Sequence, residues 1–162
     1  MRAELEQTVI ALGLQKQVVF HGNIPYKQVA QKMQEALILL ATSDYNEGWG
    51  AVINEGMNAG CAIVASRAMG SVPFLIQNGE NGFSFKNGDV AALYENVRRL
   101  LGDRALAQCV GRSAYETIAT QWNAKVAAER VLFLASNLAS AKDDGLFAEG
   151  VCAKAKVLKN GD

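Results

Sequence analysis

The sequence has few residues that could bind a metal or cross-link a fold. Its 162 residues include three cysteines, Cys61, Cys109 and Cys152, and one histidine, His21. The cysteines are widely spaced and form no C-x-x-C pair, which argues against a zinc site and against a disulfide framework. Cys61 and Cys109 stand among apolar residues, so both are predicted to be small buried side chains in a reducing compartment.

The sequence also lacks net charge and long apolar stretches. Sixteen Lys and Arg residues balance sixteen Asp and Glu residues, so no broad field attracts a polyanion, and nucleic acid is not an expected partner. The longest apolar run, 36–41, is too short for a transmembrane segment, and the first residues do not resemble a signal peptide. We therefore expect a cytoplasmic protein, with peripheral membrane association left open for a longer form.

Apolar patterns predict strands that alternate with helices. Strands are expected at 37–40, 62–65 and 83–85, and a further strand at 18–21, which Gly22 and Asn23 would close. The alternation predicts an α/β fold, a Rossmann-like parallel sheet with helices on both faces and further helices at the C-terminal end. The expected helices are one that ends at Gly13, then 26–36, 50–58, 73–77, one capped by Asp89, 104–120 and 122–138.

The order of these elements also bears on domain organisation. Residues 1–140 are predicted to form one domain and residues 141–162 a loosely packed tail. A doubly wound unit usually opens with a strand and its phosphate-binding turn, whereas this chain opens on a helix. We therefore expect that the domain lacks its first strand and that the chain belongs to something larger.

The most informative stretch is 47–60, with the sequence E-G-W-G-A-V-I-N-E-G-M-N-A-G. Gly48 and Gly50 permit a tight turn before a helix, whose unpaired N–H groups and dipole favour a phosphate. Glu55 lies among mostly apolar or small residues of that helix, and its carboxylate could accept hydrogen bonds from two sugar hydroxyls. From the pattern alone, a solvated stripe on an amphipathic helix remains the simpler interpretation.

The spacing of Glu47 and Glu55, eight positions apart, resembles the E-x7-E signature of the retaining glycosyltransferases of family 4, the glycosyl transferases group 1. The segments at 18–22, 70–73 and 78–82 resemble further motifs of that family, and the likeness extends over residues 2–138. It implies the C-terminal, donor-binding half of an enzyme with two Rossmann domains (GT-B). Such an enzyme transfers a hexose from a nucleoside diphosphate sugar to a glycan with retention, here in polysaccharide biosynthesis.

The resemblance also implies roles for individual residues. Glu47 would face the donor hexose as the catalytic residue, and Glu55 would hold the ribose hydroxyls. The other contacts would come from Gly48, Trp49 and Gly50 at the sugar and diphosphate, and from Gly22 and Asn23 at the nucleotide end. No metal and no cofactor beyond the donor substrate is implied. A glycan or lipid-linked acceptor would bind to a separate N-terminal domain.

Some positions depart from the family pattern. Trp49 replaces a usual phenylalanine, Ser71 a glycine and Phe74 a glutamate. The arginine and lysine that clamp the phosphates, in a G-R-x-x-x-x-K-G-like segment, have no counterpart in the sequence, so the chain by itself is predicted to be inactive. A non-catalytic nucleotide-binding module and a related sugar-nucleotide epimerase or phosphorylase remain alternatives.

Other polar residues offer weaker candidates. Arg67 and Lys86 could approach the ligand crevice, whereas Arg98 and Arg99 are expected at solvated positions of a helix. His21 is expected to have a structural or solvated role. A glycoside hydrolase would need two carboxylates that flank one glycosidic bond, and nothing in the sequence requires Glu47 and the helical Glu55 to meet in that way.

Overall fold

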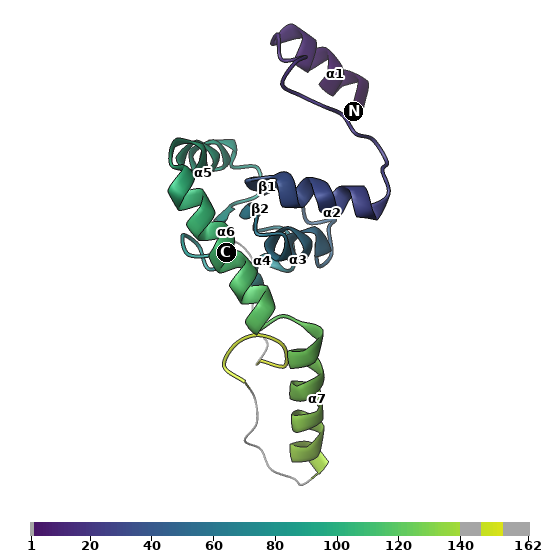
Figure 1. Ribbon diagram of the computed structural model, residues 1–162, viewed down its shortest axis with the longest axis vertical. Helices are drawn as coiled ribbons and strands as arrows, with labels where there is room; N and C mark the ends of the chain where they lie inside the picture. Colours follow the sequence, from purple (N-terminus) through teal and green to yellow (C-terminus); the bar gives the residue numbers. More distant parts are fainter. Residues whose placement is uncertain (1, 140–146, 154–162) are drawn as a thin grey trace.

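Helices and strands alternate along the first half of the protein. A computed structural model describes residues 2–139 and 147–153 (Figure 1). The elements are α1 (Arg2–Ala11), α2 (Tyr26–Glu35), β1 (Ile38–Ala41), α3 (Ala51–Asn58), β2 (Ala62–Ser66), α4 (Val72–Leu75), β3 (Phe83–Phe85), α5 (Val90–Gly102), α6 (Arg104–Thr120) and α7 (Ala124–Ala139). Most of these bounds lie within two residues of the predicted ones.

The strands form a parallel sheet in the order β1-β2-β3. Ile38 pairs with Ala62, and Val64 pairs with Phe83. Every residue of the central strand β2 is buried, as expected for a parallel strand that is covered on both faces. The short apolar sequence of β2 therefore predicted a buried parallel strand correctly.

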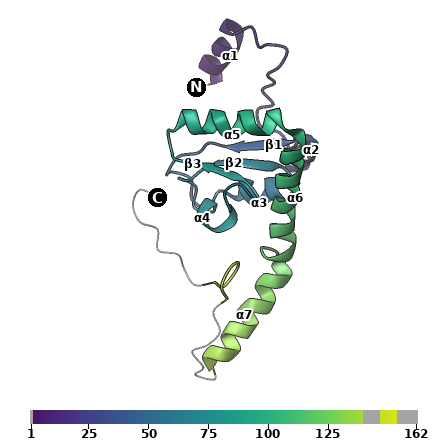
Figure 2. The ribbon, with the colours of Figure 1, turned by 90° about the vertical axis from the view of Figure 1, so that its left-hand side faces the viewer.

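Helices cover the two faces of this sheet. Ile63 and Ala65 of β2 point into a core that includes residues of α3 and α4, whereas Ala62 and Val64 point into a core shared with α5. The alternation follows from the pleat of a strand, which sends successive side chains to opposite faces. Figure 2 shows α5 over one face and α3 with α4 over the other, while α6 runs along one end of the sheet and contributes to both cores.

The predicted strand at 18–21 does not form. This segment belongs to the connection between α1 and α2, outside the sheet, and Val19 is 70% exposed. A strand needs a neighbour for its backbone hydrogen bonds, and β2 is the only described strand that pairs with β1. The other edge of β1 is thus open within the described chain, and Leu40 on that strand is 49% exposed.

Helix α1 forms as predicted, but its apolar face is not covered. Leu5 is 51% exposed and Leu12, just beyond the helix, is 65% exposed. No residue of α1 is buried, and Figure 1 shows this helix apart from the sheet and its covering helices. The sequence pattern indicated the helix correctly. Its described contact with another segment joins the Arg2 guanidinium to the Phe20 ring, 5.9 Å from the ring centre, in the connection to α2.

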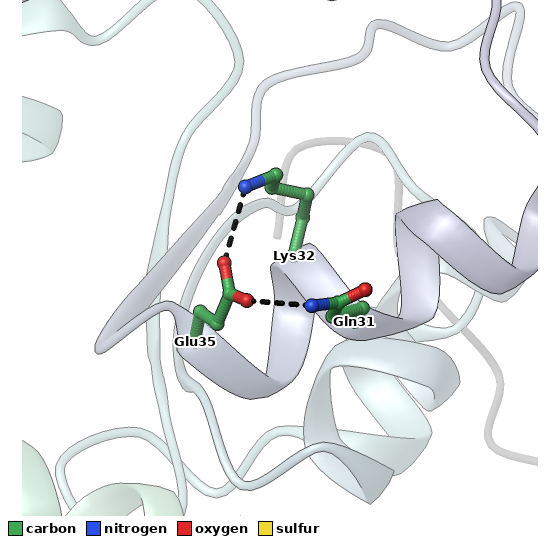
Figure 3. Close-up of polar contacts among 3 residues, drawn as sticks. All are labelled: Gln31, Lys32 and Glu35. Carbon is green, nitrogen blue, oxygen red and sulfur yellow. Dashed lines mark hydrogen bonds and ion pairs between the residues drawn. The ribbon is translucent and has the colours of Figure 1, made fainter.

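Helix α2 carries a small ion-pair network on its exposed side. Lys32 Nζ donates to Glu35 at 3.1 Å, and the Gln31 side-chain amide donates to the other carboxylate oxygen at 3.0 Å (Figure 3). These hydrogen bonds, the one from Lys32 first, lower the pKa of Glu35 below its ordinary value. The network offsets the unfavourable position of a carboxylate at the C-terminal end of a helix dipole.

The cysteines differ in their surroundings. Cys61 is fully buried, as predicted, and its thiol donates to the Met33 carbonyl at 3.0 Å. The prediction for Cys109 is wrong, because this residue is exposed on α6. The buried stripe of α6 consists of Ala107, Val110, Gly111, Ala114 and Ile118, at the spacing of one helix face. Position 109 falls outside that stripe despite its apolar neighbours.

Burial should protect Cys61 from thiol reagents. Burial raises the pKa of the Cys61 thiol, and the thiolate is the reactive form. We expect a disulfide reagent such as dithionitrobenzoate to modify the exposed Cys109 and the half-buried Cys152 in the folded protein, and to modify Cys61 only after unfolding in denaturant. Mass spectrometry of the labelled peptides would measure this. Rapid labelling of Cys61 under native conditions would contradict its burial between α2 and the sheet.

The end of the chain is described only in part. The predicted tail, 141–162, falls largely outside the described residues, and the division into a domain and a tail stays a prediction. Residues 147–153 are described and lie against α7. The Arg130 guanidinium donates to the Glu149 carbonyl and, at 3.0 Å, to the Val151 carbonyl, and it lies 4.3 Å from the centre of the Phe147 ring. Arg130 therefore fastens this segment to α7.

Candidate nucleotide-sugar site

The loop after β1 leads into the glycine-bordered start of α3. It opens with a turn in which the Asp44 carboxylate accepts from the Asn46 N–H at 2.9 Å. Further along, Gly70 N–H donates to the Gly48 carbonyl and Ser71 N–H donates to the Trp49 carbonyl, both at 2.9 Å. These two bonds fasten the loop to the segment before α4, so its backbone is held at the carboxyl end of the sheet.

Gly50 is the N-cap of α3 and needs its small size. Its φ of 76° is left-handed, a conformation that glycine adopts with little cost. No side chain caps the helix at this residue, so the first N–H groups of α3 are not occupied by a capping group. Such a helix start, with its dipole, suits an anion. The sequence prediction for the position of this turn is confirmed, while its ligand stays a prediction.

Glu55 lines a cavity of about 270 Å³ between α2 and α3. Its side chain is half-buried, and four polar residues share the cavity with it: Tyr26, Gln34, Asn54 and Asn58. Apolar side chains of Met33 and Ile118 also contribute. Glu55 therefore does not belong to a fully solvated helix face, which was the simpler interpretation of its sequence pattern. It is a carboxylate at a concave surface with other hydrogen-bonding groups around it.

The remaining predicted site residues are distributed more loosely. Glu47 is exposed in the loop before α3, next to Gly48 and Trp49. Gly22 and Asn23 are exposed in the connection before α2 and do not line the cavity of Glu55, although Tyr26, three residues after Asn23, does. The structure thus brings Glu55 together with α2, but it does not bring Gly22 and Asn23 into the same cavity.

An aromatic cluster beside the loop was not predicted from the sequence. The Trp49 ring lies 5.7 Å from that of Phe74 and 5.9 Å from that of Trp122, between ring centres. The Trp49 indole N–H also donates to the Asn54 side-chain oxygen at 2.8 Å. Trp49 and Phe74 are two of the departures from the family pattern. Two aromatic replacements in one sequence could have indicated that these side chains touch each other.

The third departure, Ser71, introduces a hydroxyl into the core. Ser71 is fully buried, and its Oγ has no hydrogen-bond partner within residues 2–139 and 147–153. A buried hydroxyl without a partner reduces stability. The serine at this position therefore gains no contact that offsets its burial, whereas Trp49 and Phe74 pack against each other.

The candidate cations do not gather at the loop. Arg98 is exposed and forms an ion pair with Glu95 at 2.8 Å, as expected for a solvated helix position. Arg67, at the end of β2, is exposed and donates to the Ser84 hydroxyl at 3.3 Å. Lys86 and His21 are exposed as well.

The parallel sheet, the covering helices and the glycine-bordered helix start define a Rossmann-like α/β domain with a candidate ligand site at the carboxyl end of its strands. Residues 1–117 match the family described as glycosyl transferases group 1. This match covers most of the sequence, so the chain belongs to that family. In the described part of the chain, no helix combines the length and hydropathy that a membrane span requires.

Curated relatives support the same family. The chain is 34% identical over 101 residues to a sulfoquinovosyl transferase of Arabidopsis thaliana, which covers 60% of the chain and 19% of that protein. It is 31% identical over 110 residues to a D-inositol 3-phosphate glycosyltransferase of Streptomyces avermitilis, which covers 68% of the chain and 23% of that protein. The chain thus spans about a fifth of the length of these relatives.

Solved structures confirm the predicted fold class. The C-terminal domain of a glycosyl transferase group 1 family protein from Francisella tularensis aligns with a TM-score of 0.70 and 27% identity, over 76% of this chain and 63% of that one. An Anabaena protein crystallised in complex with UDP aligns with a TM-score of 0.70 and 25% identity, over 83% of this chain and 36% of that one. The fold is therefore that of the Rossmann-like C-terminal half of GT-B glycosyltransferases.

Proposed function

We propose that this chain binds a nucleoside diphosphate sugar and supplies the donor side of a sugar transfer. One observation carries the proposal: Glu55, the second glutamate of the E-x7-E pattern, lines a cavity between α2 and α3 together with Asn54 and Asn58. A carboxylate beside amides is a suitable acceptor for the two hydroxyls of a ribose. The family match and the UDP-bound structural neighbour support the same ligand class.

The proposal also assigns roles to the start of α3 and to the loop before it. The uncapped N–H groups at the start of α3 would hold the diphosphate, aided by the positive end of the helix dipole. Glu47, exposed in the preceding loop, would face the hexose. The reaction would be a hexose transfer with retention to a glycan in polysaccharide biosynthesis, on the cytoplasmic side of the cell. That the chain alone transfers no sugar stays a prediction.

Replacement of Glu55 by alanine tests the donor site. We expect the dissociation constant of UDP, or of GDP or ADP if one of these is the base, to rise about 10- to 150-fold. This corresponds to the loss of about 1.5–3 kcal/mol from hydrogen bonds to a charged group. Titration calorimetry of the 162-residue chain with each nucleotide would measure it.

A matched variant separates the site from general effects of charge. Glu80→Ala removes an equally charged side chain from the exposed turn before β3, and it should leave nucleotide affinity unchanged. Equal affinities for the parent chain and the Glu55→Ala variant would refute the role given to Glu55. Weakening by both variants to the same extent would point to a nonspecific charge effect and would also refute it.

A further inference from the structure

A second cavity lies beside the aromatic cluster, and Trp122 is the described residue that it shares with the cavity of Glu55. It has a volume of about 350 Å³ and is lined by residues of α4, the end of α6 and the 148–153 segment. Trp49 connects it to the glycine-bordered loop. The volume falls within the range of about 300–1,000 Å³ that is usual for small-molecule sites. The cavity is therefore large enough for a ligand of its own.

Three aromatic side chains, tilted by 30° and 41° between neighbouring rings, give the cavity an apolar wall. Trp49, Phe74 and Trp122 all line it, and the contacts of Trp49 with the other two rings hold them as one cluster. The hydrogen bond from the Trp49 indole to Asn54 fixes the orientation of that ring. A pyranose has apolar C–H faces that can lie against such rings, since the face of an aromatic ring carries partial negative charge and C–H bonds are polarised positively.

Two amide side chains at the same cavity have unused hydrogen-bonding capacity. Gln77 and Gln121 line it. Within residues 2–139 and 147–153, neither side-chain amide makes a hydrogen bond. An amide offers both a donor and an acceptor, which is the combination that a sugar hydroxyl requires. Thr117, in contrast, is already engaged, because its hydroxyl accepts from Asn81 and donates to the Ser113 carbonyl.

The charge of the cavity argues against a phosphate ligand. Among the described residues that line it, Glu149 is the only one with a formally charged side chain, and its negative charge would repel a diphosphate. The backbone of residues 149 and 151 is held in place by Arg130, so this part of the wall is anchored to α7. Arg130 itself does not line the cavity, and its guanidinium is engaged by these two carbonyls. Aromatic rings, free amides and the lack of a cation among the described lining residues together match a neutral ligand with many hydroxyl groups.

We propose that this second cavity binds a neutral saccharide, with the aromatic cluster against one face of the sugar ring and the amides of Gln77 and Gln121 at its hydroxyls. The inference goes beyond the proposed donor function, which uses the cavity of Glu55 and the start of α3. Because Trp49 borders the loop before α3, a saccharide here would lie close to the proposed donor sugar.

Binding of simple glycosides tests this inference. Trp49 and Trp122 are the two tryptophans of the sequence, and both line the cavity, so their indole N–H signals in ¹H–¹⁵N NMR spectra respond to a ligand there. Because Trp122 also lines the cavity of Glu55 and the Trp49 indole bonds to Asn54, substitutions of Gln77 and Gln121 serve to assign the shifts to the second cavity. We expect at least one of the methyl α-D-pyranosides of glucose, mannose and galactose to shift both signals in a saturable manner. Gln77→Ala and Gln121→Ala should each weaken this binding about 2- to 10-fold, as expected for the loss of a neutral hydrogen bond.

Control variants separate this result from the donor proposal. Gln28→Ala, at an exposed position of α2 that lines neither cavity, should leave glycoside binding unchanged. Glu55→Ala should weaken UDP binding while glycoside binding persists. The absence of saturable shifts with all three glycosides would overturn the inference, and so would equal affinities in the parent chain and both cavity variants. Either result would leave a Glu55-dependent affinity for UDP standing.

Discussion

Replacement of Gly111 by alanine is expected to destabilise the protein by about 2 kcal/mol, although alanine favours helices. Gly111 lies on the buried stripe of α6, and a Cβ atom there would lie 2.2 Å from the Gly60 carbonyl oxygen. The atoms that this Cβ would meet belong to the backbone of Gly60 and Ala62. Unlike the end of a flexible side chain, they cannot move aside by a bond rotation. Overpacking of this kind costs about 1–3 kcal/mol and exceeds the gain of up to about 1 kcal/mol from helix propensity.

Thermal unfolding followed by circular dichroism would measure the effect. A loss of about 2 kcal/mol corresponds to a decrease in Tm of about 4–8 °C for a chain of this size. Gly102→Ala is the matched control, because Gly102 also lies in a helix and no atom lies within 4 Å of its added Cβ. The control should be neutral or slightly stabilising. Equal Tm values for the two variants would contradict the close approach of α6 to the sheet.

Replacement of Ile63 by alanine should be the most damaging change in the core, with a loss of about 2–5 kcal/mol. Ile63 is fully buried on the central strand β2, where it pairs with Leu39 of β1 and faces the core that α3 covers. Truncation removes apolar contacts and leaves a cavity that paired strands cannot close. Because small domains are stable by about 5–15 kcal/mol, this variant would approach the limit of folding.

Urea denaturation would provide the measurement, with two further variants for comparison. Ile63→Val should cost about 0.5–1.5 kcal/mol, since it removes a single methyl group. Leu101→Ala removes a comparable side chain that is 68% exposed and should have little effect. A loss after Ile63→Ala no larger than that after Leu101→Ala would show that β2 is not the centre of the core.

The elements that depend on local sequence could be predicted. β2 is a short apolar run whose burial on both faces follows from its composition, and Asp89 caps α5 as expected, because its carboxylate accepts from the Ala92 N–H at 2.9 Å. The segment at 18–21 had an equally suitable composition, yet it forms no strand. A strand depends on a pairing partner, and the composition of a segment does not reveal whether that partner is present.

The candidate site was predictable in part for the same reason. The glycine-bordered turn and the position of Glu55 follow from spacing along one loop and one helix. The aromatic cluster joins Trp49, Phe74 and Trp122 from three separate segments, and the second cavity also requires the 148–153 segment that Arg130 fastens to α7. Periodicity within a segment carries no information about such long-range contacts.

The open side of β1 has a consequence for how the purified chain should behave in solution. Its backbone amides and carbonyls on that side face no other strand of the described chain, and the apolar Leu40 stands beside them. An exposed strand edge of this type can pair with strands of neighbouring molecules, which promotes aggregation. A charged residue in place of Leu40 would oppose such recruitment, and solubility would then improve while the buried face of the sheet stays intact.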